Sequence, residues 1–178
     1  MPDGLMLPPG EGRVIAGGGL HATLKVPGGN PAVASTFEVV VPPGFDVGAH
    51  VHKAGQELFY VLDGELDLLA FEPQTRSAGD WHEWVSSTGT RFLRGGPGSL
   101  LFIPPGCPHA FANPTGAPAR VLFQAAPSGH EDYLDELAAL LREAKGKPDP
   151  EAVAELRRRY DIEQLTALRN PAQAMSTG

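Results

Sequence analysis

Short apolar runs that end at glycine or proline dominate the chain up to about residue 128. The segment "STFEVVVPP" (35–43) is rich in β-branched residues and stops at two prolines. The segments 98–106 and 120–127 have the same character, with Gly or Pro at their ends. Several short runs with such punctuation are typical of the strands of a sandwich or barrel. We therefore expect an all-β fold over this part of the chain.

One pair of runs is joined by a strong turn signal. In "ELFYVLDGELDLLAF" (57–71), two strand-like segments flank Asp63-Gly64. Asp-Gly between apolar runs favours a tight hairpin, because a type I′ turn needs positive φ at its central residues. The sequence thus predicts a β-hairpin over 57–71.

After residue 128 the apolar spacing changes to three and four residues. Over 131–145 it forms the stripe of an amphipathic helix, at Leu134, Leu137, Leu140, Leu141 and Ala144. We expect the helices within 131–160 to pack this leucine face on the outside of the barrel and to contribute no metal ligand.

A second helix is predicted to begin at Asp149, which is a suitable N-cap before Pro150. Its arginines at 157–159 lie near the expected C-terminus, where positive charge is favourable. We interpret them as a solvent-exposed face, with a binding role as the less favoured alternative.

The composition narrows the functional classes. A chain of 178 residues fits one domain, and its net charge of −7 disfavours a nucleic-acid or anionic-membrane partner. The single cysteine, Cys107, cannot form an intrachain disulfide and fits a reducing, cytoplasmic setting. The N-terminus is not expected to be a secretory signal, and no apolar stretch approaches the roughly 20 residues that span a bilayer.

Candidate chemistry lies in "GFDVGAHVHKAGQELFYVLDG" (44–64). Residues i and i+2 of a strand share a face, so His50 and His52 project together. The turn that follows would bring Glu57 beside them on the next strand. Two imidazoles and a carboxylate form a cation site. The alternative is two structural histidines and a surface glutamate, which is the better interpretation of an isolated His-x-His.

A second motif favours the cation site over structural histidines. In "GSLLFIPPGCPHAFAN" (98–113), a Pro-Pro-Gly turn precedes His109. The patterns Gly44-x5-His50-x-His52-x4-Glu57-x6-Gly64 and Gly98-x5-Pro104-x-Gly106-x2-His109-x3-Asn113 resemble the first and second motifs of the cupin superfamily. The resemblance covers roughly residues 33–127.

The resemblance implies a cupin double-stranded β-helix, a jelly-roll barrel of six to eight strands, here with a C-terminal helical extension. It also implies that one divalent ion (Fe, Ni, Mn, Cu or Zn) is held by His50, His52, Glu57 and His109. We divide the chain into an N-terminal arm with the first strands (1–32), the barrel (33–127) and the helical extension with its tail (128–178).

The resemblance is to single-domain quercetinase-type dioxygenases. It implies that Glu57 is a metal ligand and a candidate general base, and that the substrate is a small aromatic, enolic or polyketide-like molecule with dioxygen as co-substrate. An apolar pocket is expected around Phe59, Val61, Phe111 and Phe123. The alternatives are a non-redox isomerase, cyclase or decarboxylase, and a non-catalytic small-molecule-binding cupin.

We also expect a homodimer, because small jelly rolls usually cover their edge strands.

Other candidates are weaker. Cys107 is expected to be structural or neutral. Three histidines lie outside the two motifs: His21, His82 and His130. They have no partner at ligand spacing and are expected to be surface residues or to be satisfied by hydrogen bonds. The segment 79–92, with Trp81 and Trp84, is either a lid over the barrel mouth or, as we favour, a β-hairpin extension that packs its tryptophans locally or against another subunit.

Overall fold

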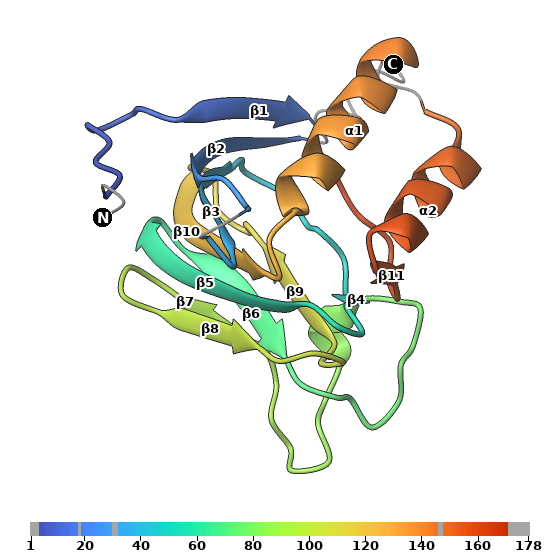
Figure 1. The fold of residues 1–178 in the computed structure, drawn as a ribbon. Helices are drawn as coiled ribbons and strands as arrows, with labels where there is room; N and C mark the ends of the chain where they lie inside the picture. The colour runs from blue at the N-terminus through green and yellow to red at the C-terminus, as the bar shows by residue number, and fades with distance from the viewer. Residues whose placement is uncertain (1–3, 18, 30–31, 146–147, 171–178) are drawn as a thin grey trace.

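The computed structural model describes residues 4–17, 19–29, 32–145 and 148–170. Over these residues two antiparallel β-sheets face each other, and two α-helices follow them (Figure 1). The all-β architecture with a C-terminal helical extension that was expected from the sequence is confirmed.

The first sheet contains six strands and the second contains five. The order in the first is β1 (Arg13–Gly17), β2 (Leu20–Val26), β3 (Ser35–Val41), β10 (Ala119–Ala126), β5 (Gln56–Asp63) and β8 (Leu100–Ile103). The order in the second is β11 (Glu163–Gln164), β4 (His50–Val51), β9 (His109–Ala112), β6 (Leu66–Ala70) and β7 (Leu93–Gly95). A 3₁₀ turn, η1 (Trp81–Glu83), lies between β6 and β7, and the helices are α1 (His130–Glu143) and α2 (Pro150–Arg159).

The core forms where the inner faces of the sheets meet. Burial along β3 alternates strictly, with Phe37, Val39 and Val41 turned inward. The neighbouring strand β10 repeats this pattern with Val121 and Phe123. An alternation of period two is what a sheet with one buried face requires.

The predicted hairpin over 57–71 is wrong in its pairing. Gly64 does adopt a positive φ of 76°, but the strands on its two sides enter different sheets. β5 pairs with β10 and β8, whereas β6 pairs with β9 and β7. The Asp-Gly signal specifies the local backbone, but long-range partners decide which strands pair. Here both edges of β5 are already occupied.

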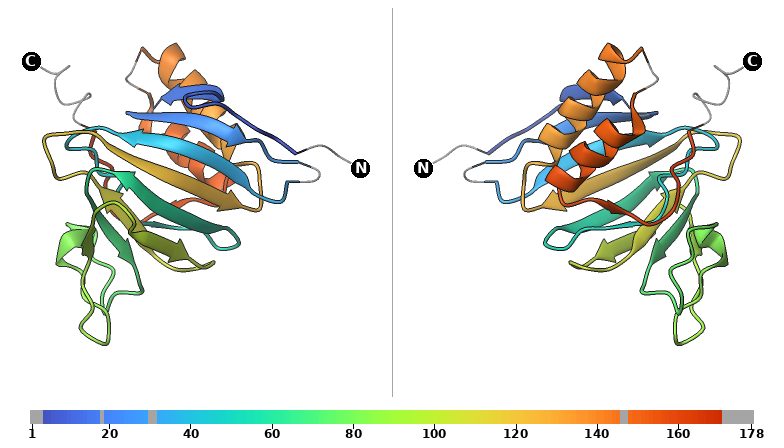
Figure 2. Two further views of the ribbon diagram at one scale, coloured as in Figure 1. Left: turned by 90° about the vertical axis from the view of Figure 1, so that its left-hand side faces the viewer. Right: turned by 90° about the vertical axis from the view of Figure 1, so that its right-hand side faces the viewer.

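The two helices lie together beside the strands at the N-terminal end of the first sheet (Figure 2). Asp149 caps α2 as predicted, because its side chain accepts a hydrogen bond from the Glu151 N–H at 3.0 Å. The helix α1 approaches β1 closely: a Cβ built on Gly17 would lie 2.9 Å from Ala138.

The expectation that the leucine face packs on the outside of the barrel is wrong. Leu134, Leu137 and Leu141 line a cavity whose opposite wall is formed by strand residues such as Ile15 and Val39. The stripe predicted the helix but not its position, since an apolar face packs equally well over either surface of a sheet.

Three expectations are not decided by the fold. The boundaries after residues 32 and 127 stay predictions, and the tail falls on positions after 170, outside the described residues. The homodimer also stays a prediction. A dimer could cover the apolar side chains that are exposed along β5 and β8, the latter being the last strand of its sheet: Tyr60, Leu62, Leu100 and Phe102.

In the described part of the chain, neither helix has the length and apolar character that crossing a bilayer requires.

Glu131 joins the start of α1 to the loop between β2 and β3. Its buried carboxylate accepts hydrogen bonds from the Gly28 N–H at 2.6 Å, from the Gly129 N–H at 3.2 Å and from the Ser35 hydroxyl. Burial alone would raise the pKa of Glu131, but these hydrogen bonds outweigh burial, and the pKa is lowered. The carboxylate is therefore ionised in the folded protein at neutral pH.

We predict that Glu131→Ala lowers the free energy of unfolding by about 1–3 kcal/mol, because three donors lose a charged acceptor. Since the folded pKa lies below the ordinary value of 4.5, this contribution is present above pH 4.5 and is lost as the pH falls through the folded pKa. Urea unfolding at pH 7 and at decreasing pH measures both effects. The control is Glu143→Ala, at an exposed position on the same helix. Equal stability of the two variants at pH 7 would contradict the prediction.

Candidate metal centre

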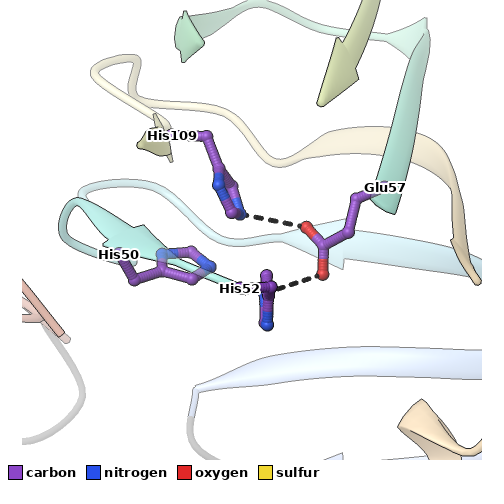
Figure 3. Close-up of side chains that lie close together, drawn as sticks. All are labelled: His50, His52, Glu57 and His109. Carbon is purple, nitrogen blue, oxygen red and sulfur yellow. Dashed lines mark ion pairs between the residues drawn. The ribbon is translucent and has the colours of Figure 1, made fainter. Parts of the chain in front are cut away.

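Four polar side chains meet in the space between the two sheets. His50 lies on β4 and pairs directly with His109 on β9. His52 follows β4 on the same face as His50, and Glu57 reaches across from β5 of the other sheet. Figure 3 shows the three imidazole rings gathered around the Glu57 carboxylate. The cluster therefore exists only when the sheets have closed on each other.

The cluster is compact and buried. One ligand atom from each of the four residues lies within 4.8 Å of the others, and no side chain is more than 8% exposed. Nε2 of His52 lies 3.2 Å from one Glu57 oxygen, and Nε2 of His109 lies 3.1 Å from the other. Neither contact has hydrogen-bond alignment, so both nitrogens are buried without a hydrogen-bond partner.

Each imidazole is oriented by its other nitrogen. Nδ1 lies 3.0 Å from a backbone carbonyl oxygen in all three rings: that of Gly48 for His50, that of Asp161 for His52 and that of Cys107 for His109. With Nδ1–H donating to these carbonyls, each Nε2 carries a lone pair. Such carbonyl partners set the tautomer and direction of a metal-binding histidine, so the donor set fits a divalent ion.

The charges of the cluster support the same conclusion. Burial alone would raise the pKa of Glu57, but its contacts with His109 and His52 hold the pKa well below the ordinary value. Burial, and then neighbouring His109, keep the pKa of His50 well below its ordinary value. Burial would also lower the pKa of His52, but Glu57 outweighs it and the pKa is raised. Glu57 is thus anionic and His50 neutral, the states that metal ligation requires, whereas His52 must release the proton that Glu57 favours before it binds a metal.

A cavity of about 1230 Å³ opens beside the cluster, and His50, His52 and Glu57 are part of its wall. Of the expected pocket residues, Phe59, Phe111 and Phe123 line it, and the rings of Phe59 and Phe123 stack at 4.7 Å. Val61 is fully buried in the core and is not among the lining residues.

The C-terminal segment contributes to the site in ways that the sequence did not indicate. Strand β11 pairs with β4 and places Gln164 opposite His50. His130, expected to be a surface or satisfied residue, is half-buried and lines the cavity. Its ring lies 5.0 Å from that of Phe123, and burial lowers its pKa. A two-residue strand has no periodicity to recognise, so only the tertiary structure shows these contacts.

Asp161, two residues after the end of α2, holds the turn that follows His52. It has a positive φ of 58°. Its carbonyl accepts from His52 Nδ1, and its carboxylate accepts from the Ala54 N–H at 2.8 Å. Burial would raise the pKa of Asp161, but hydrogen bonds from the backbone of residues 53–55 lower it. The end of α2 is therefore bound to the loop after β4.

The remaining candidates lie outside the cluster. Trp81 is fully buried and donates from Nε1 to Asp46 at 2.8 Å. Trp84 donates from Nε1 to the Ser77 hydroxyl at 3.0 Å. Neither tryptophan lines the cavity, so both pack within the chain and do not form a lid. The expected β-hairpin is wrong, because Trp81–Glu83 form the 3₁₀ turn η1 and no strand lies among the described residues between β6 and β7.

Three further candidate side chains lie away from the cluster. His82 is satisfied by carboxylates, at 2.6 Å from Asp80 and 3.4 Å from Asp67. Cys107 is half-buried, and burial raises the pKa of its thiol. His21 is exposed on β2. None of these three belongs to the metal-binding cluster found among the described residues.

Comparison with known proteins identifies a family match and several solved structures. A family model described as Cupin matches residues 21–144. An RmlC-like cupin from Shewanella frigidimarina NCIMB 400 has a TM-score of 0.53 at 15% identity, and the alignment covers 73% of this chain and 96% of that one. A predicted oxalate decarboxylase from Thermotoga maritima has a TM-score of 0.45 at 19% identity, over 61% and 80% of the two chains. No curated protein matches.

We predict that Asp161→Ala lowers the free energy of unfolding by about 1–2 kcal/mol, because alanine is strained at positive φ and the Ala54 N–H loses its acceptor. Asp161→Asn should cost less, since asparagine tolerates this conformation and keeps an acceptor. Urea unfolding compares the two variants. An alanine variant as stable as the asparagine variant would show that Asp161 does not hold the turn.

Proposed function

Because the chain belongs to the cupin family, we propose that it is a metal-dependent enzyme whose ion is held by the buried cluster of His50, His52, Glu57 and His109. The observation that supports this most directly is the common orientation of the imidazoles. All three direct Nδ1 to a backbone carbonyl, and the buried Nε2 atoms of His52 and His109 lack a hydrogen-bond partner. Buried polar atoms without partners are rare and point to a missing ligand.

The donor set indicates the type of ion. Three neutral imidazoles and one carboxylate suit a divalent metal such as Fe, Ni, Mn, Cu or Zn. When bound, the ion supplies a Lewis acid with open coordination positions for a chelating substrate or dioxygen. One ion per chain follows from the single cluster found in the described ranges.

The proposed reaction is a dioxygenation of a small aromatic, enolic or polyketide-like substrate, as in the quercetinase-type enzymes that the motifs resemble. The aromatic wall of Phe59, Phe111 and Phe123 supports a flat substrate, since aromatic faces stack on one another. The apolar walls also exclude water from the substrate. Glu57, as the carboxylate of the cluster, is proposed to take the proton of a substrate hydroxyl.

Two alternatives use the same cluster. In the first, the ion promotes a non-redox isomerisation, cyclisation or decarboxylation. In the second, the protein binds a small molecule without turnover. Both retain the metal and the cavity, so metal content tests the site and oxygen consumption tests the reaction.

We predict that His50→Ala lowers the metal content of the purified protein from about one ion per chain to a small fraction, because a ligand and its lone pair are lost. Elemental analysis by mass spectrometry measures this. His82→Ala and Cys107→Ala are matched controls at positions outside the cluster, and both should keep the metal. Full metal occupancy in His50→Ala would refute the proposed centre.

For the reaction, we predict that protein loaded with Fe(II) or Ni(II) consumes dioxygen when a flavonol or a catechol is added, and that His50→Ala does not. An oxygen electrode records the rate. A metal-loaded wild-type protein that consumes no oxygen with either substrate would contradict the dioxygenase proposal and leave the two alternatives.

A further inference from the structure

The three consecutive arginines of α2 are not equivalent. Arg158 is exposed and pairs with Glu151 at 2.7 Å and with Glu155 at 2.8 Å. Arg159 is also exposed and pairs with Glu136 at 2.6 Å. These two match the solvent-exposed face expected from the sequence.

Arg157 differs from both neighbours in burial and pairing. It is half-buried and lines the cavity together with Val153, one turn earlier, and the exposed Arg158. Among the residues that the structure describes, no carboxylate forms an ion pair with its guanidinium, although its two neighbours are both paired. A half-buried guanidinium at the wall of a largely apolar cavity, without a carboxylate partner, can pair with a negatively charged ligand.

The other charged groups of the cavity do not neutralise it. The Asp161 carboxylate is occupied by the Ala54 N–H, and Glu57 belongs to the histidine cluster. Glu163 also lines the cavity, but it is exposed, and so is Lys53. Lys53 and Glu163 offset each other in charge. Arg158 also borders the cavity, but it is already paired with Glu151 and Glu155. Arg157 is therefore the half-buried cation of the described cavity wall that has no carboxylate partner.

The size and walls of the cavity restrict the rest of that molecule. Its volume of about 1230 Å³ exceeds the roughly 300–1,000 Å³ of ordinary ligand pockets. One wall comes from strand residues such as Leu20 and Val39, and the other from leucines of α1 such as Leu137. A ligand that fills this space is largely apolar and extends beyond a single small ring.

We infer that the cavity selects an apolar molecule that carries a carboxylate, and that Arg157 is the residue that determines this specificity. The planar guanidinium binds a carboxylate through two parallel hydrogen bonds, which a lysine cannot reproduce. The inference rests on the proposed function only in naming this molecule as the substrate of the histidine cluster, since His50, His52 and Glu57 line the same cavity.

The test compares two probes of the same size, 2-naphthoate and 2-naphthamide, which differ only in charge and in the acceptor geometry of one group. Isothermal titration calorimetry measures both dissociation constants with the full chain as purified. The wild type should bind the carboxylate about tenfold more tightly than the amide, as expected for one charge-assisted pair. Arg157→Gln should reduce this ratio to about one, and Arg157→Lys should keep part of it.

Arg159→Gln is the matched control, because it removes a nearby arginine of the same helix that does not line the cavity and is already paired with Glu136. It should keep the tenfold preference, and an unfolding midpoint Tm equal in the two glutamine variants shows that both fold. A preference that persists in Arg157→Gln, or a wild type that binds neither probe or favours the amide, overturns the inference.

His50→Ala separates this result from that of the proposed function. It should lose the metal yet keep the dependence of the carboxylate preference on Arg157, measured in the His50→Ala, Arg157→Gln double variant. Retention of metal in His50→Ala refutes the metal centre without affecting the Arg157 ratio. If Arg157→Gln does not reduce the preference for the carboxylate while the wild type has its normal metal content, only the role of Arg157 is refuted.

Discussion

The interaction on which this structure depends is the enclosure of one carboxylate by three imidazoles between two β-sheets. Transferring Glu57 from water to the protein interior is costly unless partners compensate for the loss of hydration. His52 and His109 lie 3.2 and 3.1 Å from its oxygens, and backbone carbonyls hold each ring in place from behind. The strands must close in one register to bring these groups together, so the cluster and the barrel specify each other.

The C-terminal segment is part of this arrangement and not an appendage to it. Asp161 holds the His52 ring and the turn after it, and β11 extends the sheet that carries His50. The two helices then enclose a cavity against the strands, with leucines of α1 as one wall. A barrel without this segment would still have its four clustered side chains, but the cavity would lack its helical wall and His52 its carbonyl partner.

The same helices introduce the charge that distinguishes this cavity. Arg157, Arg158 and Arg159 follow one another, yet helical geometry separates their directions by about 100° per residue. Arg158 and Arg159 are exposed and pair with carboxylates, whereas Arg157 is half-buried at the cavity wall without a carboxylate partner. A run that resembles a uniform basic face therefore contains one residue with a different environment.

The sequence by itself determined several strands and both helices, because these depend on local patterns. Short apolar runs that end at Gly or Pro predicted β3 and β10, and the leucine spacing predicted α1. The resemblance of two motifs to the cupin superfamily indicated His50, His52, Glu57 and His109. Only the tertiary structure decided what depends on long-range contacts. It placed the strands around Gly64 in different sheets, turned the leucines of α1 toward the cavity and brought His130, Arg157 and Asp161 to the site. Local spacing sets which face of an element is apolar, but the surface that this face covers is decided by the packing of distant segments.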